Sequence, residues 1–265
     1  MTPAAQERRD HRRGTLYMVL VVMIWGGFLP AGKSALQMVD PYWLTALRFG
    51  TAALVFLGLL LVQEGRATLR TEGQLPRIAL FGACGFAGFG LCVFEGLKLT
   101  RPEIGAMILA LGPIQVALFQ WWRTHRRPDN FTLAAIALAL VGELFVITSG
   151  DFARLTGGDA KGNGLVFLAS LFWTAYTLGG QQFPGWSPVR YTALSCSLGW
   201  FAIVAALGIA SAAGHARPPQ MDEMIAVWPQ LTFIIFCVSV FGILFWNLGV
   251  AKLGPLNAGL FGNFA

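Results

Sequence analysis

Long apolar runs separated by short polar segments dominate this chain. A helix needs about 20 residues to cross a hydrocarbon core of roughly 30 Å. Runs of about that length cover residues 15–36, 41–63, 77–98, 102–122, 131–149, 162–183, 189–211 and 229–250. The pattern predicts an all-α polytopic membrane protein, with residues 1–265 forming a single membrane domain.

A ninth apolar run begins at Pro255 and reaches the last residue, Ala265. This stretch would rise only about 16 Å as a helix, which is too short to cross a bilayer. We therefore expect a ten-helix fold that is truncated within helix nine.

Matching residues recur in the two halves of the chain. The matches pair Trp25 with Trp173, Pro41 and Thr45-Ala46-Leu47 with Pro188 and Thr192-Ala193-Leu194, and Leu99-Thr100-Arg101-Pro102 with Lys252-Leu253-Gly254-Pro255. Such self-similarity indicates an internal duplication. We predict a first repeat over residues 14–149, with helices one to five, and a second over 162–265, with helices six to nine. Because five is odd, the second repeat is inverted relative to the first, as in many solute carriers.

Basic residues gather in alternate loops. They precede the first run and follow the second and fourth runs: Arg8, Arg9, Arg12, Arg13, Arg66, Arg70, Arg77, Arg123, Arg126 and Arg127. The remaining loops carry fewer basic residues and several acids. By the positive-inside bias, the N-terminus is predicted to be cytoplasmic.

The composition agrees with a membrane protein. Hydrophobic residues make up 55% of the chain and charged residues 12%, whereas soluble domains average roughly 25% charged residues. The loop arginines explain the net charge of +6. Binding to nucleic acid would need a basic folded face, which the pattern does not provide, so we expect the lipid bilayer and a small solute as partners and no nucleic acid.

Five ionisable residues inside the apolar runs need an explanation: Lys33, Arg48, Glu95, Lys98 and Glu143. Charge in hydrocarbon costs about 2.5–3.5 kcal/mol on insertion scales, so such groups usually face a bundle interior or water. With the predicted orientation, all five lie in the outer half of the membrane. A water-filled vestibule would account for them, with Lys33, Arg48 and Glu143 as gating or charge residues.

Simpler roles stay open for these charges. Lys33 and Lys98 lie near helix ends, where they could reach the interface. Glu95 and Lys98 are three residues apart and could pair on one helix. Arg48 is suited to a buried structural or gating role. Glu143 is either a protonated packing residue or a proton-coupling site.

Large aromatic residues inside the runs are candidates for a binding site. Trp25, Trp173, Trp200 and Trp246 lie away from the run ends, where interfacial tryptophans gather, and Tyr176 follows Trp173 on the same helix face. A pocket walled by rings would suit a flat solute, while helix packing or lipid contact is the alternative for each. The predicted substrate-binding residues are Trp25, Phe89, Glu95, Trp173, Tyr176 and Asn247.

Glycine and proline residues predict hinges within the runs. Pro30 interrupts the first run, Gly88 belongs to a glycine-rich stretch of the third, and Gly112-Pro113 lies in the fourth. Proline removes a helical hydrogen bond and permits a kink. We expect these helices to bend during transport.

Enzymatic motifs receive little support. Residues Gly27 to Ser34 match the P-loop pattern G-x-x-x-x-G-K-S, but a P-loop follows a buried strand, and this octet ends a membrane-length run. The four cysteines match no metal or redox spacing. We expect no catalytic residues, no cofactor and no metal. A membrane-embedded enzyme is the less favoured reading, because the apolar runs contain no histidine, no His-Glu-x-x-His motif and no aspartate pair.

Several short motifs resemble the EamA-type repeat of the drug/metabolite transporter superfamily. They are Trp25-Gly26 followed by Lys33, Pro41 with Arg48-Phe49, Gly96 before Pro102, and Leu111-Gly112-Pro113. The resemblance implies ten helices in two inverted repeats around a cavity between helices three, four, eight and nine, with contributions from one and six. Where members commonly have a glutamate between helices four and five, this chain has Arg123-Thr124-His125.

Within that superfamily the chain is most similar to YddG-like exporters of aromatic and other amino acids in the bacterial inner membrane. The resemblance implies a monomeric secondary transporter that exports amino acids or related small metabolites by alternating access. A drug or nucleotide-sugar carrier of the same superfamily is the alternative. A scaffold role would leave Arg48 and Glu143 unexplained.

Overall fold

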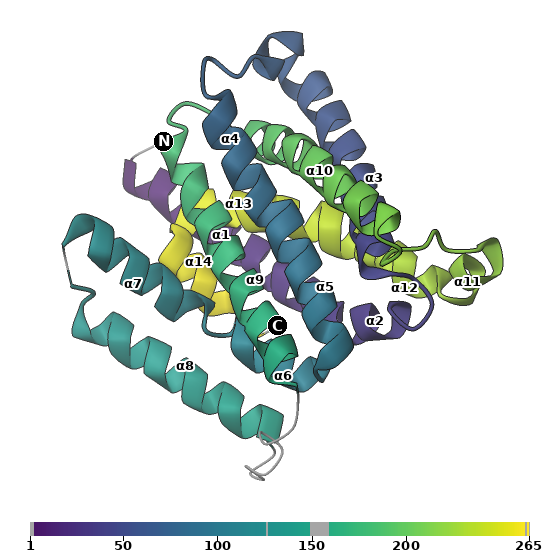
Figure 1. The fold of residues 1–265 in the computed structure, drawn as a ribbon. Coiled ribbons are helices and arrows are strands. Elements are labelled where there is room, and N and C mark those ends of the chain that lie inside the picture. The colour runs from purple at the N-terminus through teal and green to yellow at the C-terminus, as the bar shows by residue number, and fades with distance from the viewer. Residues whose placement is uncertain (1–2, 126, 149–158, 263, 265) are drawn as a thin grey trace.

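The computed structural model describes residues 3–125, 127–148, 159–262 and 264, and this part of the chain contains helices and no strand (Figure 1). The helices of the first half are α1 (Pro3–Trp25), α2 (Phe28–Ala35), α3 (Pro41–Glu64), η1 (Arg66–Leu69), α4 (Leu75–Gly82), η2 (Ala83–Gly88), α5 (Phe89–Leu99), α6 (Pro102–Leu109), α7 (Gly112–Thr124) and α8 (Asn130–Thr148).

The second half repeats this order. Its helices are α9 (Ala160–Gly179), η4 (Gly180–Gln182), α10 (Pro188–Ala212), α11 (Met221–Ala226), α12 (Trp228–Thr232), η5 (Phe233–Gly242), α13 (Ile243–Leu253) and α14 (Pro255–Gly262). Each of the nine predicted apolar runs is mainly helical over its described residues, with turns at residues 26–27 of the first run and 110–111 of the fourth.

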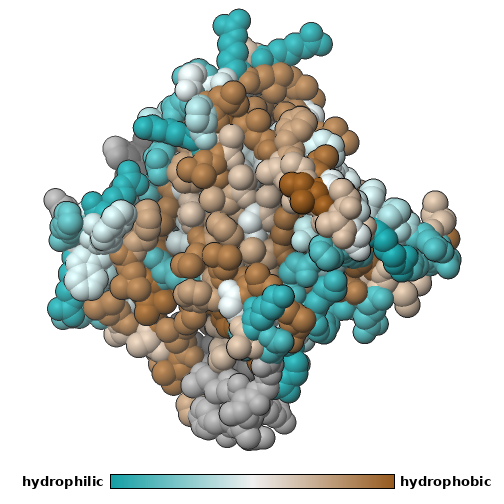
Figure 2. Space-filling model, in the orientation of Figure 1, coloured by the Kyte–Doolittle hydropathy of each residue, from teal (hydrophilic) through white to brown (hydrophobic). Residues whose placement is uncertain are grey.

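Six helical segments of the described chain are long and apolar enough to cross a membrane: Ala5–Ala35, Pro41–Glu64, Leu75–Leu99, Pro102–Thr124, Pro188–Ala212 and Trp228–Leu253. Large apolar side chains on their outer faces are exposed, including Leu54 on α3 and Phe201 on α10. Figure 2 shows such side chains covering the middle of one face, with polar residues gathered toward the margins. This surface suits contact with lipid tails. The prediction of an all-α polytopic membrane fold is confirmed.

Two equivalent helices begin with the same type of cap. Asp40 accepts a hydrogen bond from the backbone N–H of Tyr42 at 2.9 Å, and Pro41 opens α3. In the second half, Ser187 accepts from the backbone N–H of Arg190 at 2.9 Å, and Pro188 opens α10. A short polar side chain before a proline satisfies the free N–H groups of a first turn, so the repeated sequence fixes where both helices start.

The helices α3 and α10, which are equivalent in the two halves, pack against each other in antiparallel orientation (Figure 1). Trp200, near the middle of α10, donates its indole N–H to the carbonyl of Ala46, near the start of α3, at 3.1 Å. At the other end, Ser187, which begins α10, hydrogen-bonds to Glu64, which ends α3. Equivalent helices that run in opposite directions are what an inverted repeat requires.

Two further helix interfaces are equivalent in the two halves. A Cβ atom at Gly96 on α5 would lie 2.8 Å from Val166 of α9, and one at Gly249 on α13 would lie 2.1 Å from Met18 of α1. Gly96 matches Gly249 in the repeat alignment, and Met18 matches Val166. The same close packing therefore joins α5 to α9 and α13 to α1, related by a pseudo-twofold axis perpendicular to the helices. The repeat boundaries at 14–149 and 162–265 stay predictions.

Candidate functional site

A cavity lies between the two halves, lined by α1, α2, α3, α5, α6, α7 and α9 and by η5, α13 and α14. The volume open to the centre of a water molecule is about 140 Å³. A single water needs roughly 10–15 Å³ on the same basis. The cavity is therefore large enough for a small organic molecule.

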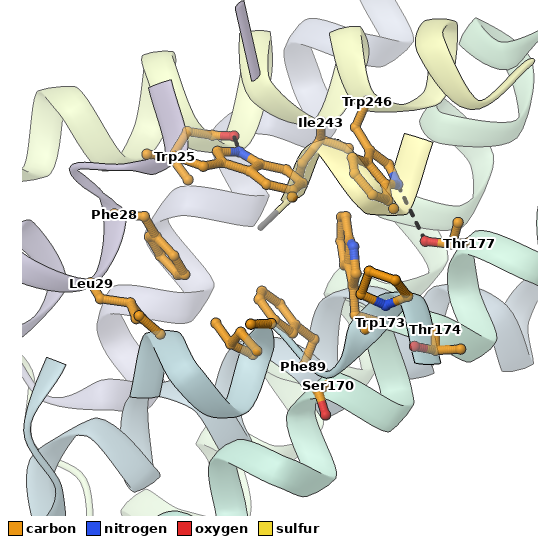
Figure 3. Close-up of a pocket in the computed structure, with 18 of the residues that line it drawn as sticks. Trp25, Phe28, Leu29, Phe89, Ser170, Trp173, Thr174, Thr177, Ile243 and Trp246 are labelled. Atoms are coloured by element: carbon orange, nitrogen blue, oxygen red, sulfur yellow. Dashed lines mark hydrogen bonds between the residues drawn. The ribbon is translucent and has the colours of Figure 1, made fainter. Parts of the chain in front are cut away.

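Aromatic rings from both halves wall this cavity (Figure 3). Trp25 of α1 stacks on Trp246 of α13 with 5.2 Å between ring centroids. Trp173 of α9 lies 5.9 Å from Trp246 and 5.1 Å from Phe89 of α5. Phe28 of α2 lies 6.3 Å from Phe89. The predicted binding residues Trp25, Phe89 and Trp173 are thus brought together, although Trp246 was not among the predicted binding residues.

Hydrogen bonds hold two of the indole rings in place. Trp246 donates its N–H to the hydroxyl of Thr177 at 3.2 Å, and Trp25 donates to the carbonyl of Val238 at 3.4 Å. A Cβ atom at Gly242 would lie 2.3 Å from the indole nitrogen of Trp25. Only glycine leaves room for this ring against η5, so the wall of the cavity is built from rigid aromatic surfaces.

A polar group lies next to Trp173, on the wall that α9 forms. Ser170 and Thr174 of α9 line the cavity, and Gln115 of α7 connects them by donating to the Ser170 hydroxyl at 2.7 Å and accepting from Thr174 at 3.0 Å. This group was not predicted from the sequence. A glutamine inside an apolar run that faces hydroxyl residues was the signal that could have found it, because buried amides need partners.

Arg48 of α3 lines the cavity and is only 1% exposed. Its guanidinium carbon lies 4.1 Å from the ring centroid of Phe49, 4.5 Å from that of Phe94 and 5.3 Å from that of Phe28. Its Nε and Nη2 atoms are buried and have no hydrogen-bond partner among the described residues. The expectation that Arg48 is buried agrees with this placement. Its gating role stays a prediction.

Two of the predicted binding residues lie behind the cavity wall. Tyr176 is fully buried, and its hydroxyl accepts a hydrogen bond from Asn247 at 2.8 Å. Asn247 also donates to the Thr192 hydroxyl at 2.9 Å. Neither Tyr176 nor Asn247 is among the residues that line the cavity. Both therefore hold α9, α10 and α13 together rather than facing a solute.

The remaining predicted charges lie elsewhere. Lys33 donates to the backbone carbonyls of Leu97 at 2.6 Å and Thr100 at 3.0 Å, so it caps the C-terminal end of α5, where the helix dipole favours a cation. Glu95 is half-buried on α5 and does not line the cavity. Glu143 belongs to α8, but its side chain lies outside the described residues.

The predicted hinges coincide with breaks in the helices. The first span is interrupted between Trp25 and Phe28, one turn before Pro30, and the fourth between Leu109 and Gly112, directly before Pro113. Proline excludes the hydrogen bond to the fourth residue before it, which explains both positions. Gly88 ends the π-helical segment η2. A hinge function at these positions stays a prediction.

The π-helical conformation of two segments was not predicted from the sequence. η2 (Ala83–Gly88) lies in the third predicted run, residues 77–98, and η5 (Phe233–Gly242) lies at the corresponding place in the eighth, residues 229–250. π-Helical turns often lie at functional sites. Here they lie directly before Phe89 and Ile243, which both line the cavity.

The residues that match a P-loop, from Gly27 to Ser34, form most of α2 within the first span. Across the described part of the chain, no cluster of three or more His, Cys, Asp or Glu side chains could hold a metal ion. The chemistry of the cavity is therefore that of aromatic rings, hydroxyl groups and one guanidinium.

An all-helical membrane fold with inverted halves around a central cavity defines the class of small-molecule transporters. The chain belongs to the EamA-like transporter family, whose model matches residues 12–148. It is 31% identical to the uncharacterized transporter YrdR of Bacillus subtilis over 95% of this chain and 80% of that protein. It is 25% identical to the biotin transporter of Salmonella typhimurium over 93% of this chain and 79% of that protein.

A solved crystal structure shares the fold. It covers 94% of this chain and 84% of its own chain with a TM-score of 0.70 and 19% sequence identity. The resemblance to the EamA-type repeat is confirmed, and with it the assignment to small-molecule transport. Neither of these two relatives is named as an amino acid exporter, so the similarity to YddG-like exporters stays a prediction.

Proposed function

We propose that this chain is a secondary transporter that binds small amphipathic metabolites in the central cavity and carries them by alternating access. The observation that supports the proposal is the cavity itself, which is walled by Trp25 from one half and by Trp173 and Trp246 from the other. A site at the interface of inverted repeats is exposed to either side in turn when one half rocks against the other.

Amino acids with flat side chains are the proposed solutes, and export from the cytoplasm is the proposed direction. The indole rings would stack on the flat side chain, and the hydroxyls of Ser170 and Thr174 would bind its polar end. A drug or nucleotide-sugar carrier of the same superfamily is the alternative. The relative named as a biotin transporter adds biotin to the solutes to be tested.

The helix breaks support a mechanism for the alternation. η2 and η5 interrupt the third and eighth spans at equivalent places, where bending would move Phe89 and Ile243 relative to the rest of the site. We propose that helices three and four bend against helices eight and nine in a monomer of the bacterial inner membrane, with the N-terminus in the cytoplasm.

Counterflow in proteoliposomes tests the proposed function. Vesicles loaded with an unlabelled solute should accumulate the same labelled solute, and a panel of amino acids with biotin identifies which solutes exchange. Trp173→Ala removes ring contacts worth about 0.5–1.5 kcal/mol each, so solute affinity should fall about tenfold. Trp122→Ala, at a residue that is 73% exposed, is the matched control and should leave exchange unchanged.

Two outcomes contradict this proposal. If no member of the panel exchanges in vesicles that contain folded protein, then the chain does not carry small metabolites of this class. If Trp173→Ala and Trp122→Ala exchange solutes equally well, then the indole wall does not bind them.

A further inference from the structure

Arg48 is the one charged side chain among the described residues that line the cavity. No described lining residue is acidic, so the cavity carries a net positive charge. The ion pairs of the described chain join other residues, namely Arg190 to Glu72, Arg217 to Glu223 and Lys252 to Asp10. Arg48 therefore lies in the site without a carboxylate partner from the described protein.

The aromatic rings around Arg48 attract its positive charge but do not accept hydrogen bonds from all of its N–H groups. Phe49 and Phe94 lie within 4.5 Å of the guanidinium carbon, and such ring faces attract a cation. A ring face offers no oxygen to accept from N–H groups, however, and a guanidinium has five such donors in a planar fork. Its Nε and Nη2 atoms remain unpartnered. A fork of this kind matches the two oxygens of a carboxylate.

The second half provides an internal comparison. Ser195 of α10 matches Arg48 in the repeat alignment, is also fully buried, and donates its hydroxyl to the carbonyl of Tyr191. In the second half, a small side chain with its own hydrogen bond therefore fills the equivalent position. The repeat does not require a cation at this place, so the charge of Arg48 needs a different explanation.

Arg48 and the indole rings line the same cavity. Phe28 connects the two parts of the site, because its ring lies 5.3 Å from the Arg48 guanidinium carbon and 6.3 Å from the ring of Phe89. Phe89 in turn lies 5.1 Å from Trp173. One small molecule could place an acidic group at Arg48 and a flat apolar body against the indoles.

We propose that Arg48 binds the carboxylate of the transported solute, and that the substrates are organic carboxylates with a flat apolar body, for which an ammonium group is not required. This inference rests on the proposed transport function and specifies its substrate class. Since no acidic side chain is present among the described lining residues, a cationic amine has no ion-pair partner there. Amino acids then bind through their carboxylate end.

Three indoles that differ only in charged groups test the inference. Indole-3-propionate carries a carboxylate, tryptophan carries both charges, and tryptamine carries the ammonium alone. Isothermal titration with the full-length chain in detergent should show that the first two bind at least tenfold more tightly than tryptamine. Biotin and its amide form a second pair with a different body, and biotin should bind at least tenfold more tightly than the amide.

Variants at Arg48 give the second part of the test. Arg48→Gln should lower the affinity for indole-3-propionate at least tenfold and leave that for tryptamine unchanged, while Arg48→Lys should retain part of the preference. Lys98→Gln is the matched control, because Lys98 is exposed and does not line the cavity, and it should change neither affinity. Should Arg48→Gln not fold, the preference of the wild-type protein within each pair decides the inference.

The outcomes separate this inference from the proposed function. Equal binding of indole-3-propionate and tryptamine to the wild-type protein overturns the carboxylate site, even if counterflow shows transport of other solutes. Equal loss of all three ligands in a folded Arg48→Gln variant also overturns it and makes Arg48 a packing residue. Absence of counterflow for every solute, with folded protein in the vesicles, contradicts transport itself.

Discussion

The indole rings of Trp25 and Trp173 meet edge to face in the central cavity, with 5.5 Å between their centroids. These residues match in the repeat alignment and come from α1 and α9, which are equivalent helices. Their contact therefore crosses the boundary between the two halves. A motion that rocks one half against the other would change this contact, which links the geometry of the site to the proposed alternation.

Substitution of Tyr176 should affect folding before it affects transport. Tyr176 was predicted to belong to the binding site, but its side chain is fully buried behind the wall and accepts a hydrogen bond from Asn247. Tyr176→Ala should cost about 3–5 kcal/mol, as large aromatic deletions in cores do, and should lower the yield of folded protein. Size-exclusion chromatography and thermal unfolding in detergent measure this. A folded variant with normal stability and weakened solute binding would return Tyr176 to the site.

Lys33 should contribute to stability as a helix cap. It donates to the carbonyls of Leu97 and Thr100 at the end of α5, so Lys33→Met should lower the free energy of unfolding by about 1–2 kcal/mol. Thermal unfolding in detergent measures the loss, with the exposed Lys98→Met as control. A gating role predicts a different result, namely a changed transport rate with unchanged stability.

Gly82 should tolerate no side chain. A Cβ atom there would lie 2.2 Å from the backbone carbonyl oxygen of Ser195, where α4 crosses α10. Gly82→Ala should therefore force the helices apart and destabilise the protein by about 1–3 kcal/mol. At Gly58 nothing lies within 4 Å of the same atom, so Gly58→Ala should be neutral or stabilising. Equal melting temperatures for the two variants would contradict the close crossing.

Acid should weaken the contact between the loop that follows α3 and the start of α10. Arg190 forms an ion pair with Glu72 at 2.7 Å. The hydrogen bond from Arg190 is the main cause that lowers the pKa of Glu72 from its ordinary value of 4.5, and the hydrogen bond from Trp186 is the second. A carboxyl group with a lowered pKa stabilises the folded state above its unfolded pKa and loses that contribution as the pH falls through the folded pKa.

The measurement compares wild type with Glu72→Gln between about pH 5 and about pH 3, the range around and below the ordinary glutamate pKa. The melting temperature of the wild type should fall more steeply, since other carboxyl groups act equally in both proteins. The difference should be small and sensitive to salt, because Glu72 is exposed and surface ion pairs are screened. Parallel curves would show that the ion pair contributes nothing.

The residues of the candidate site were predictable to different degrees. Trp25 and Trp173 stand in the middle of apolar runs, away from the interfaces where tryptophan gathers, and they match in the repeats, so their place near the centre follows from the chain. Tyr176 and Glu95 also lie within runs, but the rotation of each helix turns them away from the cavity. That rotation depends on which neighbours a helix packs against.

For the charged residues Lys33 and Arg48 as well, the sequence predicted only part of their placement. Both fall in apolar runs and were predicted to avoid lipid. The backbone carbonyls that end α5 hold Lys33, while Arg48 lies between phenylalanine rings at the cavity. The position of a charge along a run predicts its depth. It does not predict its partners, which come from residues far away in the sequence.

Apolar runs of membrane length, the matched prolines and the odd number of helices in each repeat determined the all-helical fold and its inverted halves, because hydrocarbon requires every backbone polar group to be paired within the helix. Only the tertiary structure decided which faces of the helices enclose the cavity, where the π-helical segments interrupt them, and that Arg48 lies in the wall without an acidic partner in the described part of the chain. These features depend on close contacts between helices distant in the chain, and a linear pattern does not encode the distances between them.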